Sequence, residues 1–216
     1  ILILAGGTLN VTGTLTNNGT LNLGTGGQSI TVGNFANNGT LAGTGTINGN
    51  IVNTGNVAPG NSPGTLNIVG NFTTSGTLTI ELAGATPGTQ FDRINVSGNT
   101  TINGGTLNVV QLNGFTSPAN ASYTFINTQG TATGKFATVN MPAAFNGYSV
   151  SYGAKFTDIV GGITPATTTT SNTPPPSNSS LIVATQSSAP DPDGGSDVKE
   201  ITADELKKEL QERACQ

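Results

Sequence analysis

The chain has 216 residues, of which 8% are charged and 5% are aromatic, and it contains no His and no Trp. Its net charge is −4 and it has no basic patch, which argues against a protein that neutralises a nucleic-acid backbone. A single cysteine, Cys215, excludes an internal disulfide framework, and no apolar run reaches the length of a membrane helix. The abundant Thr, Val and Ile favour β-strands.

The chain opens with ILILAGG, residues 1–7, which has neither an initiator Met nor a basic flank. These residues therefore lack the pattern of a secretory signal. We expect them to be a strand entered partway, in a fragment of a longer protein whose targeting signal would lie upstream.

A nine-residue phrase is then repeated along the chain. Its copies GTLTNNGTL, GNFANNGTL, GNIVNTGNV and GNFTTSGTL align without gaps and begin at Gly13, Gly33, Gly49 and Gly70. A looser fifth copy begins at Gly98, after a longer interval. The spacing of the first four copies is too short for a helical-repeat protein.

Within each phrase the third and ninth residues are apolar and their neighbours are small and polar. This alternation is typical of short strands with one buried face, and the intervening NNG, NTG and TSG are turn sequences. We predict that the apolar residues of the repeats form one continuous inward column. Its members are Leu15, Leu21, Phe35, Leu41, Ile51, Val57, Phe72, Leu78 and Leu107.

Short strands and tight turns that recur about every 20 residues predict a parallel β-helix, or β-solenoid, over residues 1–163. Each coil would stack on the next at about 4.8 Å. Asn or Thr residues at equivalent positions could form hydrogen-bonded ladders between the coils. An antiparallel sandwich or barrel also has short strands and frequent turns, and it remains the alternative.

The stretch VAPGNSPGTLNIVGNFTTSGTLTIELAG, residues 57–84, resembles a motif near the ends of passenger β-helices in bacterial autotransporters and filamentous-haemagglutinin-like exoproteins. FDRINVSG (91–98), GGTLNVV (104–110) and YTFINTQGTATGKF (123–136) extend the resemblance, which covers about residues 33–163. The family implies a right-handed parallel β-helix, extracellular placement, and a role in adhesion, aggregation or biofilm formation.

The resemblance also implies a route of export. A single-chain autotransporter would continue into a membrane β-barrel of alternating strands, whereas this chain leaves the strand pattern after Ile163. If Gln216 is the natural end, the chain fits an adhesin of two-partner secretion, exported through a separate outer-membrane barrel transporter without inserting into the membrane itself. A receptor on a host cell or another bacterium would be its second partner.

Residues 164–195 are predicted to be a flexible, disordered linker rich in Pro, Thr and Ser, and residues 196–216 a short helical tail. Thr202 and Glu205 fit a helix capping box. We expect that the linker threads the secretion pore and that the tail, through Leu206, Leu210 and Cys215, holds the protein at the cell from the periplasm. A plain flexible spacer is the alternative for the linker.

We predict no catalytic residue, cofactor site or metal site. The repeat region has three acids, Glu81, Asp92 and Asp158, and neither His nor Cys, which is too few for polysaccharide lyase or hydrolase chemistry. Asp92 is expected to form a local ion pair or turn with Arg93, and Glu81 to lie on a solvated strand face. A polysaccharide-binding or polysaccharide-modifying β-helix is the second functional hypothesis, although its only aromatic platforms would be Tyr123, Tyr148 and Tyr152.

Overall fold

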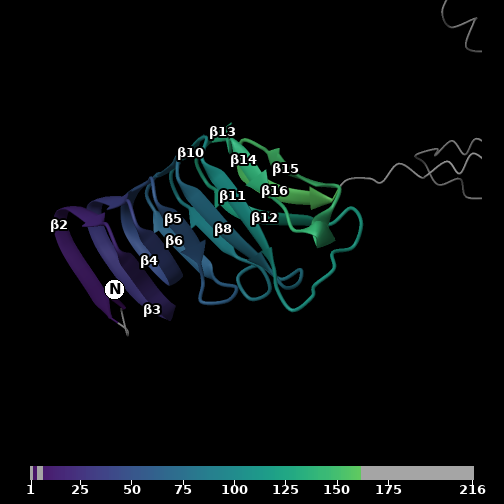
Figure 1. The fold of residues 1–216 in the computed structure, drawn as a ribbon. Coiled ribbons are helices and arrows are strands. Elements are labelled where there is room, and N and C mark those ends of the chain that lie inside the picture. Colours follow the sequence, from purple (N-terminus) through teal and green to yellow (C-terminus); the bar gives the residue numbers. More distant parts are fainter. Residues whose placement is uncertain (1, 4–6, 162–216) are drawn as a thin grey trace, which may run out of the picture. The chain divides into compact units, whose positions relative to one another are not determined.

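The computed structural model describes residues 2–3 and 7–161, all within one compact unit, Ile1–Ala166. The described part is all-β, and its sixteen strands belong to a single sheet (Figure 1). Within these residues the one helical element is a single 3-10 turn, η1, at Ala143–Phe145. The predicted linker at 164–195 and the predicted helical tail at 196–216 lie outside the described residues.

The strands vary from 2 to 18 residues in length. In chain order they are β1 (Leu2–Ile3), β2 (Thr8–Asn17), β3 (Thr20–Asn37), β4 (Thr40–Asn53), β5 (Asn56–Pro59), β6 (Thr65–Val69), β7 (Phe72–Thr74), β8 (Thr77–Leu82), β9 (Arg93–Val96), β10 (Thr100–Asn103), β11 (Thr106–Gln111), β12 (Ser122–Thr128), β13 (Ala132–Lys135), β14 (Thr138–Asn140), β15 (Tyr148–Tyr152) and β16 (Phe156–Gly161). In Figure 1 strands β2, β3 and β4 lie beside one another, and the later labelled strands continue the same row.

Strands from successive repeats pair in parallel. Leu15 pairs with Phe35, Phe35 with Ile51, and Ile51 with Phe72, and each of these residues is the third of its phrase. Phe72 then pairs with Thr100, the third residue of the looser fifth copy. Each pairing offset therefore equals the distance between the starts of two successive copies. The prediction that equivalent positions of the phrase lie in register is confirmed.

The apolar residues of the phrase form two columns on different strands, and both columns belong to one buried cluster. Among the copies of the phrase, third-position residues pair with third-position residues. Ninth-position residues form another series, in which Leu21, Leu41, Val57 and Leu78 are paired in that order. The series continues to Leu107, which is the tenth residue of the looser fifth copy. The turn between the third and ninth positions places the two series on different strands, and their side chains share the same core.

A further apolar column, formed by Ile30, Ile47, Ile68 and Val96, runs along another set of strands. All four side chains are buried. Buried and partly exposed residues alternate along β8, because successive side chains of a strand point to opposite faces. The three columns together supply the apolar core that no single repeat could bury alone.

Asparagine side chains at the fifth position of the phrase form a ladder along the stack. Asn17 Nδ2 donates to Asn37 Oδ1 at 2.7 Å, and Asn37 Nδ2 donates to Asn53 Oδ1 at 2.7 Å. Asn53 Nδ2 then donates to Thr74 Oγ1 at 3.0 Å. Asn37, Asn53 and Thr74 are fully buried, so the ladder satisfies polar groups that would otherwise be costly inside the protein. The predicted side-chain ladder is confirmed.

Close stacking of the turns explains the recurring glycine at the seventh position of the phrase. A Cβ atom at Gly55 would lie 2.1 Å from the carbonyl oxygen of Gly39, one repeat earlier. A Cβ at Gly76 would lie 2.2 Å from the oxygen of Gly55 in the same way. Only glycine allows the backbones of successive turns to approach this closely.

The later repeats are longer because the loops at one corner of the stack grow. The connections are residues 60–64 between β5 and β6, 83–92 between β8 and β9, and 112–121 between β11 and β12. Since β5, β8 and β11 pair with one another, as do β6, β9 and β12, these loops belong to the same corner. They appear together beside β8 and β12 in Figure 1. The extra residues are thus added without changing the register of the strands.

The C-terminal end of the described part departs from the parallel pattern. Strand β16 pairs antiparallel with both β12 and β15. Aromatic rings pack beneath this end: Phe91 and Phe115 each meet Tyr123 edge-on, with ring centroids 5.5 and 6.3 Å apart, and Phe145 meets Tyr148 at 5.2 Å. By contrast the apolar residues at the other end are only partly buried; they are Leu9, Val11 and Leu15.

Candidate functional site

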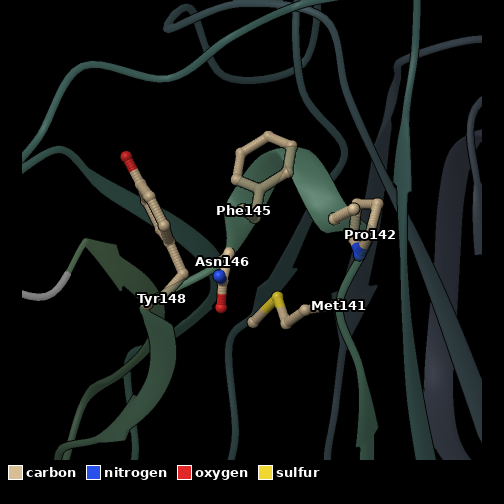
Figure 2. Close-up of a pocket in the computed structure, with 7 residues that line it drawn as sticks. Met141, Pro142, Phe145, Asn146 and Tyr148 are labelled. Carbon is tan, nitrogen blue, oxygen red and sulfur yellow. The ribbon is translucent and has the colours of Figure 1, made fainter.

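Two cavities lie at the C-terminal end of the described part. The first has a volume of about 230 Å³ and lies at the turn η1, with Phe145 between Pro142 and Tyr148 (Figure 2). Its lining is Met141, Pro142, Ala143, Phe145, Asn146, Gly147 and Tyr148. No lining side chain carries a charge, so this cavity offers neither an acid or base nor a strong ionic anchor.

The second cavity is larger, about 310 Å³, and it has a different chemical character. It lies between β13 and the turn that joins β15 to β16. The polar side chains that line this cavity are Thr133, Lys135, Tyr152 and Thr157. The remaining lining residues are Ile102, Ala132, Gly134, Gly153 and Ala154. A half-open cavity with an aromatic ring, a cation and hydroxyl groups is suited to binding a small polar molecule.

Tyr152 is held in place at the edge of this cavity. Its hydroxyl oxygen accepts a hydrogen bond from the Phe136 backbone N–H at 3.2 Å, and its ring lies 6.5 Å from the Phe136 ring. Burial raises the pKa of the Tyr152 hydroxyl, so the side chain stays neutral at physiological pH. Lys135 Nζ lies 5.8 Å from the centroid of the Tyr152 ring, within the range of a cation–π contact.

Asp92 is the most unusual acid of the described part. Its side chain is only 1% exposed. Oδ1 accepts a hydrogen bond from the Gly64 N–H and Oδ2 accepts one from the Glu81 N–H, each at 2.8 Å. Desolvation raises the pKa of Asp92 to about 7, against the opposing effect of the two backbone hydrogen bonds.

The contacts of Asp92 fasten the loop corner. Gly64, Glu81 and Asp92 belong to three different segments, and the carboxylate ties them together. The expected pairing with Arg93 is replaced by these backbone contacts, while Arg93 Nε is buried without a hydrogen-bond partner among the described residues. Asp92 is the last residue of the loop and Arg93 is the first residue of β9.

The other two acids have separate surroundings. Glu81 is partly exposed on β8, and desolvation raises its pKa. Asp158 on β16 accepts a hydrogen bond from Thr124 Oγ1 at 2.5 Å. Within the described residues no three His, Cys, Asp or Glu side chains gather into a possible metal site.

Eight of the nine predicted core residues are buried, and Leu15 is partly exposed in β2. The suggested anchoring residues Leu206, Leu210 and Cys215 lie outside the described part of the chain. In the part that is described, no helix has both the length and the apolarity to cross a membrane.

Sequence reasoning missed the second cavity. Its lining residues come from β10, β13 and the β15–β16 turn, and they span the chain from Ile102 to Thr157. One signal was available: the three tyrosines and two of the three cations of the repeat region lie at or after Tyr123. That clustering marks the C-terminal end as chemically different from the repeats.

Comparison with known proteins adds no family. None of the protein-family models matches this chain. No curated protein matches it either.

Proposed function

We propose that residues 1–163 form a right-handed parallel β-helix that serves as the stalk of a secreted or surface-displayed bacterial adhesin. The observation that carries this proposal is the in-register parallel pairing of each repeat with the next, from Leu15 through to Thr100. Parallel pairing of this kind favours a solenoid over an antiparallel sandwich.

A stalk role agrees with the surface chemistry of the stack. Its outward positions are mainly Thr, Asn and Ser, and large exposed apolar side chains in the described part are limited to Val52, Val69, Val139 and Phe156. Such a surface resists unintended association without many charges. The role of the stack would be to carry more distal binding regions away from the cell.

For export we propose two-partner secretion through an outer-membrane barrel, with the chain at the cell surface. The segment between Asp158 and Asp191 supports passage through a pore, because it contains no charged side chain. Deleting residues 196–216 should release the protein into the medium if the tail retains it. Unchanged retention on the cells would reject that part of the proposal.

The stalk proposal is tested by changing the length of the stack in a bacterium that co-produces such a transporter. An epitope is placed before Ile1 and detected with an antibody on intact cells. Deleting residues 33–48 removes one whole repeat and joins Val32 to Gly49, so the register is kept. Deleting residues 33–40 removes half of that repeat and breaks the register.

Display of the epitope is expected to survive the whole-repeat deletion and to be lost with the half-repeat deletion, because repeats stack as modules. Equal loss of epitope display in the two deletion variants would contradict a modular stalk. Equal display in both would show that the stack is not needed to present what precedes it.

A further inference from the structure

The second cavity has walls that are fixed by backbone hydrogen bonds. Ala154 O, in the turn between β15 and β16, accepts from the Ala132 N–H at 2.7 Å. Lys155 O in the same turn accepts from the Thr128 N–H at 2.8 Å. The cavity is thus a preformed feature of the junction between the parallel strands and the antiparallel end, which lowers the ordering cost of binding.

Its aromatic wall is also fixed. Tyr152 is half-buried, and the hydrogen bond from the Phe136 N–H holds its hydroxyl. The neutral tyrosine ring offers an apolar face beside polar groups, an arrangement suited to the C–H face of a sugar ring. Thr133 and Thr157 add hydroxyl groups that can donate to and accept from sugar hydroxyls.

Lys135 supplies the only charged group of the lining. The Lys135 side chain is exposed. None of the three acids of the described part lines this cavity. Asp158 contacts Thr124, Asp92 contacts two backbone amides, and Glu81 lies on β8. Lys155, in the β15–β16 turn, donates through Nζ to the Gln129 carbonyl oxygen and does not line the cavity. The ammonium of Lys135 is therefore placed to meet an anionic group above the Tyr152 ring.

We propose that this cavity binds an acidic saccharide, with the sugar ring on Tyr152, its carboxylate on Lys135 and its hydroxyls on Thr133 and Thr157. The volume of about 310 Å³ lies at the lower end of the range of ligand pockets, which favours a single sugar unit of a longer chain. The half-open shape leaves room for the neighbouring units to extend into solvent. This activity is separate from the stalk role and does not depend on it.

The test is calorimetric titration of the whole chain with tetragalacturonate, a chain of four uronic acid units. Neutral galactose tetramer and inorganic phosphate are titrated under the same conditions. Tetragalacturonate is expected to bind, and its affinity is expected to fall as salt is added, because the charged contact is exposed. The neutral tetramer is expected to bind at least tenfold more weakly, and phosphate not to compete.

Variants locate the binding. Lys135→Gln and Tyr152→Ala should each weaken tetragalacturonate binding at least tenfold, whereas Lys155→Gln should leave it within twofold of wild type. Tyr152→Phe keeps the ring and should bind within about threefold, which separates loss of the platform from loss of folding.

Each other result overturns the proposal. No binding of tetragalacturonate removes it outright, and full binding by Lys135→Gln or by Tyr152→Ala places the ligand elsewhere. Equal binding of the neutral tetramer removes the role of the charge, and displacement by phosphate shows an anion site without saccharide recognition.

Discussion

Asn37 and Asn53 are 16 residues apart in the chain, and the side-chain amide of Asn37 donates to the side-chain oxygen of Asn53 at 2.7 Å in the fully buried interior. The same Asn37 amide also donates to the Asn56 carbonyl oxygen at 2.9 Å. A single side chain thus joins its own repeat to the next through both a side chain and the backbone. Such a contact fixes the register of the stack, because a slip by one residue would leave these groups without partners.

Asn37→Ala should therefore destabilise the protein strongly. It removes the acceptor of Asn17 Nδ2 and the donors to Asn53 and Asn56, all in or near the buried ladder. Since a buried polar group without a partner costs about 1–3 kcal/mol, we expect a loss of roughly 2–4 kcal/mol in the free energy of unfolding. Urea unfolding followed by circular dichroism measures it.

The matched control is Asn38→Ala, one residue along the same turn. Asn38 donates to Asn18 Oδ1 at 2.9 Å and accepts from Thr54 Oγ1 at 2.8 Å, but these contacts are exposed to solvent. We expect a change within about 0.5 kcal/mol, because water replaces the lost partners. If Asn37→Ala and Asn38→Ala lowered the free energy of unfolding equally, burial of the ladder would not be the reason for its contribution to stability.

A second prediction concerns the glycine of the turn. Gly55→Ala places a Cβ atom 2.1 Å from the Gly39 oxygen and 2.6 Å from the Asn38 carbonyl carbon. Both are backbone atoms and cannot move alone, so we expect a loss of about 3 kcal/mol or more in the free energy of unfolding. Thermal unfolding monitored by circular dichroism would show it as a lower Tm.

Gly19→Ala is the control for this substitution, since Gly19 occupies the same position of the first phrase. Apart from Gly19 itself and its two chain neighbours, no atom of the described structure lies within 4 Å of a Cβ built there. We expect a change within about 0.5 kcal/mol. A large loss at Gly19 as well would point to the conformation of the turn, rather than its stacking distance, as the reason for glycine.

Much of the stack could be predicted from the sequence because the repeats carry their own alignment. The spacings between Gly13, Gly33, Gly49 and Gly70 predicted which strands pair and in which register, and the shared Asn predicted the ladder. The structure adds that the third and ninth positions lie in two columns, because a turn between them places them on different strands of the same core. Only the pairing distinguishes the two columns.

The loop corner and the second cavity were beyond prediction for another reason. Asp92 stands next to Arg93 in the sequence, which predicted a local ion pair or turn, yet its hydrogen-bond partners are the backbone amides of Gly64 and Glu81. Lys135 and Tyr152 meet at the end of the stack where β16 turns back antiparallel against β12. Contacts of this kind depend on irregular segments, where no repeat indicates the partner.

A third prediction tests the apolar columns. Leu78 is fully buried, and its neighbours in the column are Val57 and Leu107. Leu78→Ala should lower the free energy of unfolding by about 2–5 kcal/mol, since it removes buried methyl groups and leaves a cavity. Val52→Ala, at a residue that is 50% exposed, should change it by less than about 0.5 kcal/mol. Similar urea midpoints for the two variants would contradict the burial of this column.

The fourth prediction concerns pH and follows from Asp92. Its pKa is about 7 in the folded protein and near 3.9 in an unfolded chain, so the folded state holds an additional proton between these values. The contribution of Asp92 to the free energy of unfolding is therefore complete below about pH 4, and it declines as the pH rises to about 7. A difference of about three pKa units between the folded and unfolded states corresponds to a decline of at most about 4 kcal/mol in the free energy of unfolding.

Urea unfolding from pH 4 to pH 8 measures this decline, and no histidine of the chain titrates in the same window. Asp92→Asn removes the titrating group, and its free energy of unfolding should lose most of the slope. Glu81→Gln serves as the comparison, because desolvation also raises the pKa of Glu81 and gives a slope of the same sign. If Asp92→Asn keeps the wild-type slope while Glu81→Gln abolishes it, the pH dependence belongs to Glu81 and the buried carboxyl is not its source.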